Sequence, residues 1–136
     1  MAINILRFVI PKSLVEFIDT ESTVRQAIEK MLYHRYTAIP VLDVEGKYVG
    51  VLRNDDVLSY FLNSKNASIY DAEEHPVTEF MDTSAKPLLH STSMNELVDG
   101  VKEHNFLPVV DDRGCFIGII LRRDVLNYLL KFYKDE

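Results

Sequence analysis

Cysteine, long apolar runs and positive charge are all scarce in this sequence of 136 residues. The single cysteine, Cys115, cannot form an internal disulfide, which indicates a reducing compartment such as the cytoplasm. The longest apolar runs, such as residues 116–121, are too short to cross a bilayer. No positively charged start precedes a long apolar stretch, so we expect neither a secretory signal nor a membrane partner.

The charge balance is acidic, with 15 Lys and Arg against 21 Asp and Glu and a formal net charge of −6. That balance disfavours a dedicated nucleic-acid binder, and any anionic ligand must be met by a local cluster of positive groups. The composition is 47% hydrophobic with five Gly and five Pro, which is typical of a globular chain. The length fits one compact domain or two small, interdependent halves.

An internal repeat is the most informative feature that the sequence does contain. When Pro40 is placed over Pro108, ten of the 23 positions up to Leu62 are identical without a gap, and six of the other 13 exchange one apolar residue for another. Farther upstream, residues 5–9 resemble residues 77–81. We therefore expect two copies of one structural unit, at 1–66 and 67–136.

Each copy shows the periodicities of strand, helix, strand, strand and helix. In the first copy, apolar residues recur at helical spacing from Val24 to Leu32, after Ser22 or Thr23 as the N-cap; Thr92 or Ser93 would cap the equivalent helix. A buried strand is predicted at 38–42, then a turn that ends in glycine, a second strand and a helix from Asn54 or Arg122. The polar stretch 63–75 suits a linker. The predicted fold class is therefore α/β (α+β), with tandem β-α-β-β-α repeats packed about a pseudo-twofold.

This element order, the Pro-Val strand and the ending Gly-apolar-apolar-x-x-x-Asp resemble CBS domains, which occur in tandem as a Bateman module. More narrowly, residues 36–43, Arg122-Arg123 and Asn105-Phe106 are similar to the free-standing CBS-pair regulators of Gram-positive bacteria that bind cyclic di-AMP. The resemblance implies a regulatory protein that is not an enzyme and needs no cofactor. It also implies a homodimer.

In CBS pairs, a ligand site combines the first two strands of one repeat with the Gly-to-Asp motif of the other. The resemblance implies a site A in which strand residues offer backbone groups to adenine, arginines bind phosphate and an aspartate accepts hydrogen bonds from ribose. Its residues are Leu14, Glu16, Tyr36, Thr37, Ala38, Arg122, Arg123 and Asp124.

A second, weaker site B is implied by the same correspondence. It contains Asp55 where site A has Arg123, and an added carboxylate repels phosphate. The serine or threonine that the family often has three residues after the glycine is replaced by Arg53 and Leu121. The residues of site B are Leu88, Leu89, His90, Asn105, Phe106, Arg53, Asn54 and Asp56.

Other chemistry-bearing residues have plainer explanations. The four histidines show no metal-ligand spacing with Cys115, so no metal site is expected. His34 and His104 end predicted helices, where a cationic side chain suits the helix dipole. The acidic residues of 71–75 are expected to be solvated, and Cys115 to be a small packed residue in a strand.

The leading hypothesis is a cytoplasmic, non-catalytic sensor of cyclic di-AMP that docks on a partner enzyme, possible partners including an alarmone synthetase. One physical objection is that a 3′,5′-cyclic dinucleotide offers Asp124 only a 2′-hydroxyl, whereas AMP, ADP or ATP offers a diol. Alternatives are an AMP, ADP or ATP energy sensor, or a constitutive protein-interaction adaptor with vestigial pockets. An enzyme is the least favoured reading, since no nucleophile–base pair is visible.

Overall fold

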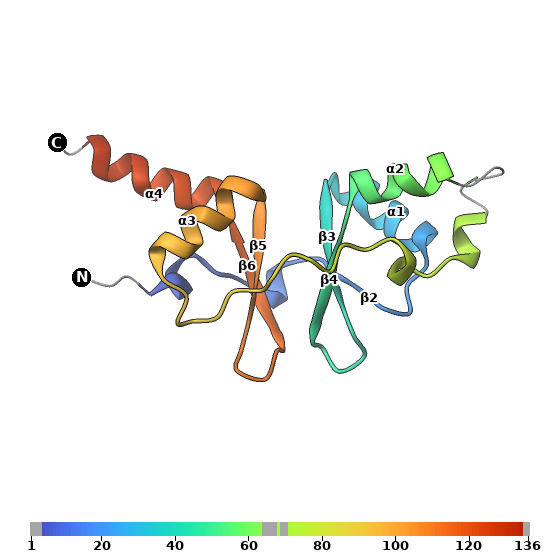
Figure 1. Cartoon of the computed structure of the whole chain (residues 1–136), viewed down its shortest axis with the longest axis horizontal. Helices are drawn as coiled ribbons and strands as arrows, with labels where there is room; N and C mark the ends of the chain where they lie inside the picture. Colours follow the sequence, from blue (N-terminus) through green and yellow to red (C-terminus); the bar gives the residue numbers. More distant parts are fainter. Residues whose placement is uncertain (1–3, 64–67, 69–70, 135–136) are drawn as a thin grey trace. The chain divides into compact units, whose positions relative to one another are not determined.

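The computed structural model describes residues 4–63, 68 and 71–134 of the chain and has a mixed α+β fold (Figure 1). The predicted fold class is confirmed. The helices are α1 (Val24–His34), α2 (Asn54–Asn63), α3 (Met94–Glu103) and α4 (Arg122–Lys134), with short 3-10 turns η1 (Ile5–Phe8), η2 (Lys12–Leu14), η3 (Asp71–Glu74) and η4 (Val77–Glu79). The strands are β1 (Ile10–Pro11), β2 (Ile18–Asp19), β3 (Ala38–Leu42), β4 (Tyr48–Arg53), β5 (Phe106–Val110) and β6 (Phe116–Leu121).

The chain forms two compact units. One comprises Glu16–Lys86, and the other comprises Met1–Val15 together with Pro87–Glu136. We call them the central unit and the terminal unit. The division expected between residues 66 and 67 lies outside the described residues and stays a prediction.

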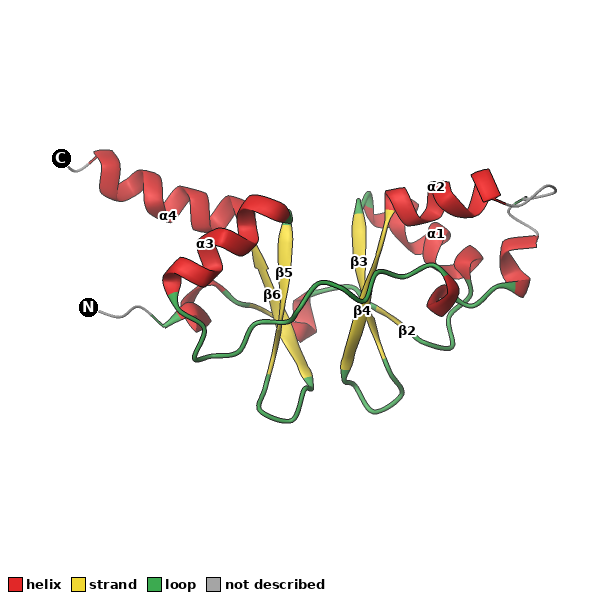
Figure 2. Cartoon of the chain, in the orientation of Figure 1, coloured by secondary structure: helices red, strands yellow, loops and turns green. Residues whose placement is uncertain are grey.

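The central unit contains a sheet of order β2-β3-β4, in which β2 is parallel to β3 and β3 and β4 form an antiparallel hairpin. Both α1 and α2 lie on one side of this sheet (Figure 2). Its core is made by apolar side chains of the helical stripe, the strands and η4. The buried members are Ile18, Ala27, Met31, Ile39, Val41, Leu52 and Val77.

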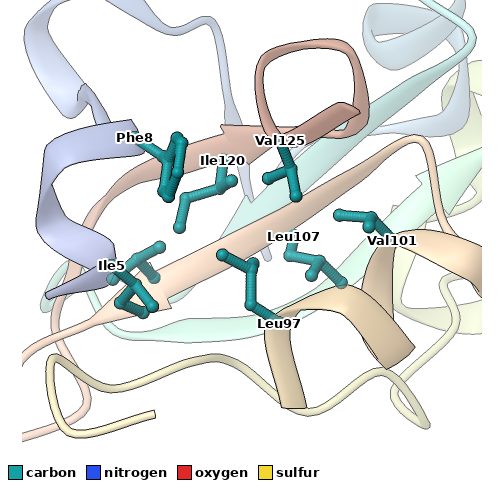
Figure 3. Packing of buried hydrophobic residues seen from close by; sticks show 8 residues of the cluster. Ile5, Phe8, Leu97, Val101, Leu107, Ile120 and Val125 are labelled. Atoms are coloured by element: carbon teal, nitrogen blue, oxygen red, sulfur yellow. The ribbon is translucent and has the colours of Figure 1, made fainter. Parts of the chain in front are cut away.

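The terminal unit has the sheet order β1-β6-β5, with every pairing antiparallel. The first strand expected in the second copy is a single parallel bridge from Leu88 to Val109. Residues of η1, α3, β5, β6 and α4 fill the core, and most of them are drawn in Figure 3. They are Ile5, Phe8, Leu97, Val101, Leu107, Val109, Ile120 and Val125.

The upstream segments of the two copies occupy equivalent positions. In the terminal unit Ile10 pairs with Ile119, and in the central unit Asp82 pairs with Val51. The segment at the start of the first copy therefore packs on the sheet of the second copy, while the segment at the start of the second copy packs on the sheet of the first. This explains the resemblance between residues 5–9 and 77–81, which lie in and beside η1 and η4.

Both hairpin turns have the same local construction. The carboxylate of Asp43 accepts hydrogen bonds from the backbone of Glu45 and Lys47, and the carboxylate of Asp111 accepts equivalent bonds from Arg113 and Cys115. Each turn ends in a glycine with positive φ, 87° at Gly46 and 84° at Gly114, a conformation that favours glycine. The expectation of a glycine-ended turn is thus confirmed in both copies.

The linker expectation for residues 63–75 is wrong in part. Residues 64–67 and 69–70 lie outside the described part of the chain, but η3 packs against α1. Ala72 is fully buried there, and Arg25 Nη1 lies 3.2 Å from Glu73 Oε2. The contact could not be predicted from this polar stretch, because a single alanine supplies its apolar surface. The acidic neighbours of Ala72 remain exposed, as expected.

Candidate functional site

In each unit, the start of the second helix is tied to the residue just before the first strand of the hairpin, which is β3 in the central unit and β5 in the terminal unit. In the central unit, the N–H of Asn54 donates to the carbonyl of Thr37 at 3.0 Å. In the terminal unit, the N–H of Arg122 donates to the carbonyl of Asn105 at 2.8 Å. The central unit thus brings the strand residues of site A, which we call its strand half, beside the helix-start residues of site B, which we call its helix half. The terminal unit brings the strand half of site B beside the helix half of site A. Sites A and B each draw residues from both units, so their assembly stays a prediction.

The strand half of site A surrounds Tyr36. The N–H of Tyr36 bonds to the carbonyl of Met31 at 2.8 Å, and its ring stacks on His34 with a centroid separation of 5.3 Å and an interplanar angle of 25°. The carboxylate of Glu16 lies 3.1 Å from Lys30 Nζ and 3.6 Å from His34 Nε2. Glu16 is therefore engaged by α1, and His34 positions the ring of Tyr36 as well as ending the helix.

A hollow of about 350 Å³ opens in the central unit beside Tyr36 and Thr37. Thr37 is exposed and Ala38 half-buried, while Leu14, in the terminal unit, is 74% exposed. The hollow is mainly apolar on the α1 side and polar at the start of α2. Its lining residues are Ile28, Met31, Leu32, Arg35, Tyr36, Thr37, Asn54 and Val57.

The helix half of site A lies at the start of α4, where the two arginines have different surroundings. The guanidinium of Arg122 donates to Val101, Lys102 and Asn105 within the terminal unit. The side chain of Arg123 is 76% exposed, and its Nε lies 3.9 Å from the carboxylate of Asp124. The structure thus leaves the fork of Arg123 facing solvent beside a partly exposed carboxylate at a helix N-terminus, where anions are favoured.

The helix half of site B lies at the start of α2 and is differently charged. Arg53 forms an ion pair with Asp82, and its backbone N–H donates to Asp56 Oδ2 at 2.8 Å. Burial raises the pKa of Asp56, against the lowering effect of that hydrogen bond. Asp55 is exposed at the same helix start. The only arginine predicted for site B therefore already has a carboxylate partner.

Asp82 is a residue that the sequence reasoning missed. Hydrogen bonds from the hydroxyl and N–H of Ser84, at 2.6 and 2.8 Å, and the Arg53 guanidinium lower the pKa of Asp82 to about 2. Nearby, burial raises the pKa of Tyr48 to about 12, and its hydroxyl donates to the carbonyl of Ala85 at 3.3 Å. The sequence contains no signal for this contact, because aligning residues 77–81 with 5–9 pairs Asp82 with Ile10 and does not say which strand lies beside either residue.

The strand half of site B lies before and in β5. Asn105 is exposed and accepts the hydrogen bond from Arg122, and Phe106 is half-buried opposite Leu121. His90 Nε2 lies 3.4 Å from Asp112 Oδ1 and is a surface side chain. Leu88 and Leu89 precede it, and the N–H of Leu88 donates to the carbonyl of Pro108 at 2.8 Å.

Neither a group of metal-ligating side chains nor a membrane-spanning helix is found in the part of the chain that the structure describes. Among those residues, no three His, Cys, Asp or Glu side chains are grouped so that they could hold a metal ion. None of the described helices is both long and apolar enough to cross a membrane. Cys115 is half-buried next to β6, as expected for a packed residue.

Two repeats with these sheets, turns and helix starts define a class of small α+β modules built from a tandem repeat. A model of the family described as "CBS domain" matches residues 10–63 and 77–131. The chain belongs to the CBS-domain family, with two CBS repeats in tandem. The resemblance seen in the sequence is thereby confirmed.

The relatives with curated descriptions are longer than this chain. An uncharacterized 17.7 kDa protein of Acidianus ambivalens is 26% identical, with 79% of this chain and 63% of that protein covered. An uncharacterized protein of Methanocaldococcus jannaschii is 25% identical, with 96% and 50% covered. The inosine-5′-monophosphate dehydrogenase of Methanocaldococcus jannaschii also matches, but the match covers only 21% of the length of that enzyme. The chain thus spans about half to two thirds of the first two relatives.

Solved structures resemble the chain over nearly its whole length. A hypothetical conserved protein of Geobacillus kaustophilus has a TM-score of 0.87 at 28% identity, with 96% of this chain and 98% of that chain covered. CBSX2 in complex with AMP, a protein also solved from Arabidopsis thaliana, has a TM-score of 0.78 at 25% identity, with 96% and 98% covered. Listeria monocytogenes CbpB in complex with cyclic di-AMP has a TM-score of 0.85 at 22% identity, with 97% and 98% covered, and shows likeness of fold.

Proposed function

We propose that this protein is a non-catalytic adenine-nucleotide sensor of the cytoplasm and that cyclic di-AMP is its ligand. The observation that carries the proposal is the solvent-facing guanidinium of Arg123 next to Asp124 at the N-terminus of α4. A phosphate-binding fork beside a ribose-binding carboxylate suits a nucleotide, and the chain is otherwise acidic. Structural neighbours solved with cyclic di-AMP and with AMP support the same ligand class.

The proposed binding mode assigns each residue a separate task. Tyr36, Thr37 and Ala38 present backbone groups to the adenine edge, with the Tyr36 ring packed beside the base. Arg123 donates to a phosphate oxygen, and Asp124 accepts a hydrogen bond from a ribose hydroxyl. None of these roles transfers a proton or forms a covalent bond to the nucleotide, so the proposed function requires neither a cofactor nor a metal.

A second candidate is a sensor of AMP, ADP or ATP. A free ribose diol would use both acceptor oxygens of Asp124, whereas cyclic di-AMP offers a single 2′-hydroxyl to each carboxylate. The structure of CBSX2 with AMP, at 25% identity over 96% of this chain, supports this alternative. Cyclic di-AMP remains the first candidate because residues 36–43, Arg122-Arg123 and Asn105-Phe106 resemble the CBS pairs that bind it.

Calorimetric titration of the full chain with cyclic di-AMP, AMP, ADP and ATP tests the proposal. Tight, saturable binding of cyclic di-AMP with weaker binding of the mononucleotides is the expected result. Tight binding of AMP or ATP with no response to cyclic di-AMP would establish the second candidate. No binding to any of the four, with no ligand-induced thermal shift, would favour a constitutive interaction adaptor.

Site B is proposed to be the weaker site because Arg53 already pairs with Asp82. Displacing that carboxylate by a phosphate would break an ion pair and leave two negative groups close together. Asp124→Ala should therefore reduce nucleotide affinity more than Asp56→Ala does. Equal losses in the two variants would mean that both sites are occupied.

A sensor without catalysis must transmit its state by docking, and we propose a partner enzyme as the target, an alarmone synthetase being one possibility. Pull-down from a cell extract with and without the bound nucleotide tests ligand-dependent docking. A partner retained in equal amounts under both conditions would support the adaptor alternative.

A further inference from the structure

Arg122 has an unusually complete set of hydrogen-bond partners for a residue at a helix start. Its Nε donates to the carbonyl of Val101 at 2.6 Å and its Nη2 to that of Lys102 at 3.4 Å. Its Nη1 donates to Asn105 Oδ1 at 2.8 Å. All four residues belong to the terminal unit, and the Arg122 backbone N–H also binds the carbonyl of Asn105.

The way in which α3 ends explains why these acceptors need a partner. Arg35 is the C-cap of α1: its N–H donates to the carbonyls of Leu32 and Met31, and its left-handed φ of 59° brings the N–H of Tyr36 onto the carbonyl of Met31. The C-cap of α3 is His104, which has an extended backbone and whose N–H donates to the carbonyl of Gly100. The carbonyls of the last turn after Gly100 have no partner within the helix itself, and a planar guanidinium can satisfy two of them at once.

We propose that Arg122 is a positioning residue that caps α3 and holds Asn105, and that phosphate recognition at the start of α4 falls to Arg123. The ligand part of this inference rests on the proposed function. Asn105 belongs to the predicted strand half of site B and Arg122 to the predicted helix half of site A. Their contact therefore ties the two halves together inside one unit.

The charge and geometry of the two arginines favour this division of roles. A phosphate that captured the Arg122 fork would strip donors from two backbone carbonyls and from Asn105. The side chain of Arg123 is 76% exposed, and binding a phosphate would cost it only the long ion pair with Asp124, in which Nε lies 3.9 Å from the carboxylate. The central unit keeps the backbone bond, from Asn54 to Thr37, but neither residue offers a guanidinium, so the side-chain clamp belongs to the terminal unit.

Thermal unfolding of the ligand-free full chain tests the clamp. We expect Arg122→Met and Asn105→Ala each to lower the melting temperature by about 3–8 °C. The melting temperature of the double variant should lie within about 2 °C of that of Arg122→Met, because both substitutions remove the same contact. Arg113→Met, at an exposed position of the β5–β6 turn, is the matched control and should leave the melting temperature unchanged. Additive losses, or no loss in either single variant, would overturn the proposal.

The division of roles is tested by the salt dependence of cyclic di-AMP affinity. A contact between an exposed guanidinium and a phosphate is screened by salt, so Arg123→Met should flatten that dependence. Asn105→Ala changes no charge; it should lower affinity while leaving the salt dependence as steep as in the wild type. Two results together would make Arg122 a phosphate ligand and overturn the division of roles. The salt dependence of affinity would be as flat in Arg122→Met as in Arg123→Met, and Asn105→Ala would bind cyclic di-AMP with wild-type affinity. If the wild type does not bind cyclic di-AMP, the proposed function fails, while the unfolding experiment still decides the clamp.

Discussion

At the scale of single residues, two glycines allow the upstream segments to approach the sheets. A Cβ on Gly118 would lie 2.1 Å from the carbonyl oxygen of Ile10, and a Cβ on Gly50 would lie 2.8 Å from that of Asp82. Both neighbours are backbone atoms and cannot rotate away. The same repeat position is glycine in both copies because another backbone segment lies directly against it.

Gly118→Ala should destabilise the protein strongly, since it forces β1 away from β6. We expect a loss of about 3 kcal/mol in the free energy of unfolding, measured by urea denaturation. Gly114→Ala is the comparison, because a Cβ there meets open space and only the positive φ is strained, at a cost of about 1 kcal/mol. Equal losses in the two variants would show that the close approach at Gly118 does not matter.

Asp82 gives the protein a specific acid sensitivity. Its pKa in the folded chain is about 2, below the value of about 3.9 in an unfolded chain, so its stabilising contribution is full above pH 4 and lost as the pH falls toward 2. With a side chain 27% exposed, that contribution is about 1–2 kcal/mol. Denaturation at pH 5 and pH 2.5 should show a larger loss in the wild type than in Asp82→Asn.

The control for this pH dependence is Asp99→Asn, whose side chain is 75% exposed. Burial raises the pKa of Asp56, which acts in the opposite direction to the lowered pKa of Asp82. A wild type and an Asp82→Asn variant that lose equal stability between the two pH values would contradict the assignment.

At the scale of elements, α1 and α3, the first helix of each repeat, both begin with a reciprocal capping box. Ser93 Oγ accepts from the N–H of Glu96 at 3.1 Å, and the Glu96 carboxylate accepts from the N–H of Ser93 at 3.4 Å. Thr23 and Gln26 make the same arrangement at α1. Of the paired alternatives in the sequence, Thr23 and Ser93 are the caps.

Ser93→Ala should cost about 1 kcal/mol in the free energy of unfolding, because one N–H at the start of α3 loses its acceptor. Ser91→Ala, two residues earlier at an exposed position, should change the stability by less than about 0.5 kcal/mol. Thermal or urea unfolding of both variants measures the difference. A Ser93→Ala variant as stable as the wild type would show that α3 does not need this cap.

The sequence predicted those elements whose signal is local. Helical spacing from Val24 located α1, the apolar run at 38–42 located β3, and the glycine-ended turns located both hairpins. The exchange of upstream segments was not predicted, because the pairing of Ile10 with Ile119 joins residues far apart in the chain. Local periodicity contains no information about such partners.

Side-chain roles at the candidate site divide in the same way. Two adjacent arginines at a helix start indicate an anion site, and the structure leaves Arg123 open as that pattern requires. The partners of Arg122 could not be predicted, because they depend on where α3 ends and on whether its last residue adopts a left-handed conformation. Asp82 was missed because its partner Arg53 lies in the preceding repeat.

At the scale of the whole molecule, exposed apolar side chains on α2 and α4 favour self-association. We propose a homodimer, which the resemblance to CBS pairs also implies. Light scattering at micromolar concentration should give twice the chain mass of 15.7 kDa, and Leu62→Glu and Leu130→Glu should lower it. A 15.7 kDa species with and without ligand would contradict the proposal. The exposed residues are Leu58, Phe61, Leu62, Leu126, Leu129, Leu130 and Phe132.

The central claim is that the start of α4 recognises the phosphate of an adenine nucleotide, and calorimetric titration of Arg123→Met with cyclic di-AMP tests it most directly. Removing one charge-assisted contact worth about 1.5–3 kcal/mol should reduce affinity about 10- to 100-fold. The melting temperature without ligand should barely change, because the side chain is exposed. Arg113→Met should keep wild-type affinity. Equal weakening by both substitutions would show diffuse electrostatics, and unchanged affinity in Arg123→Met would contradict the account.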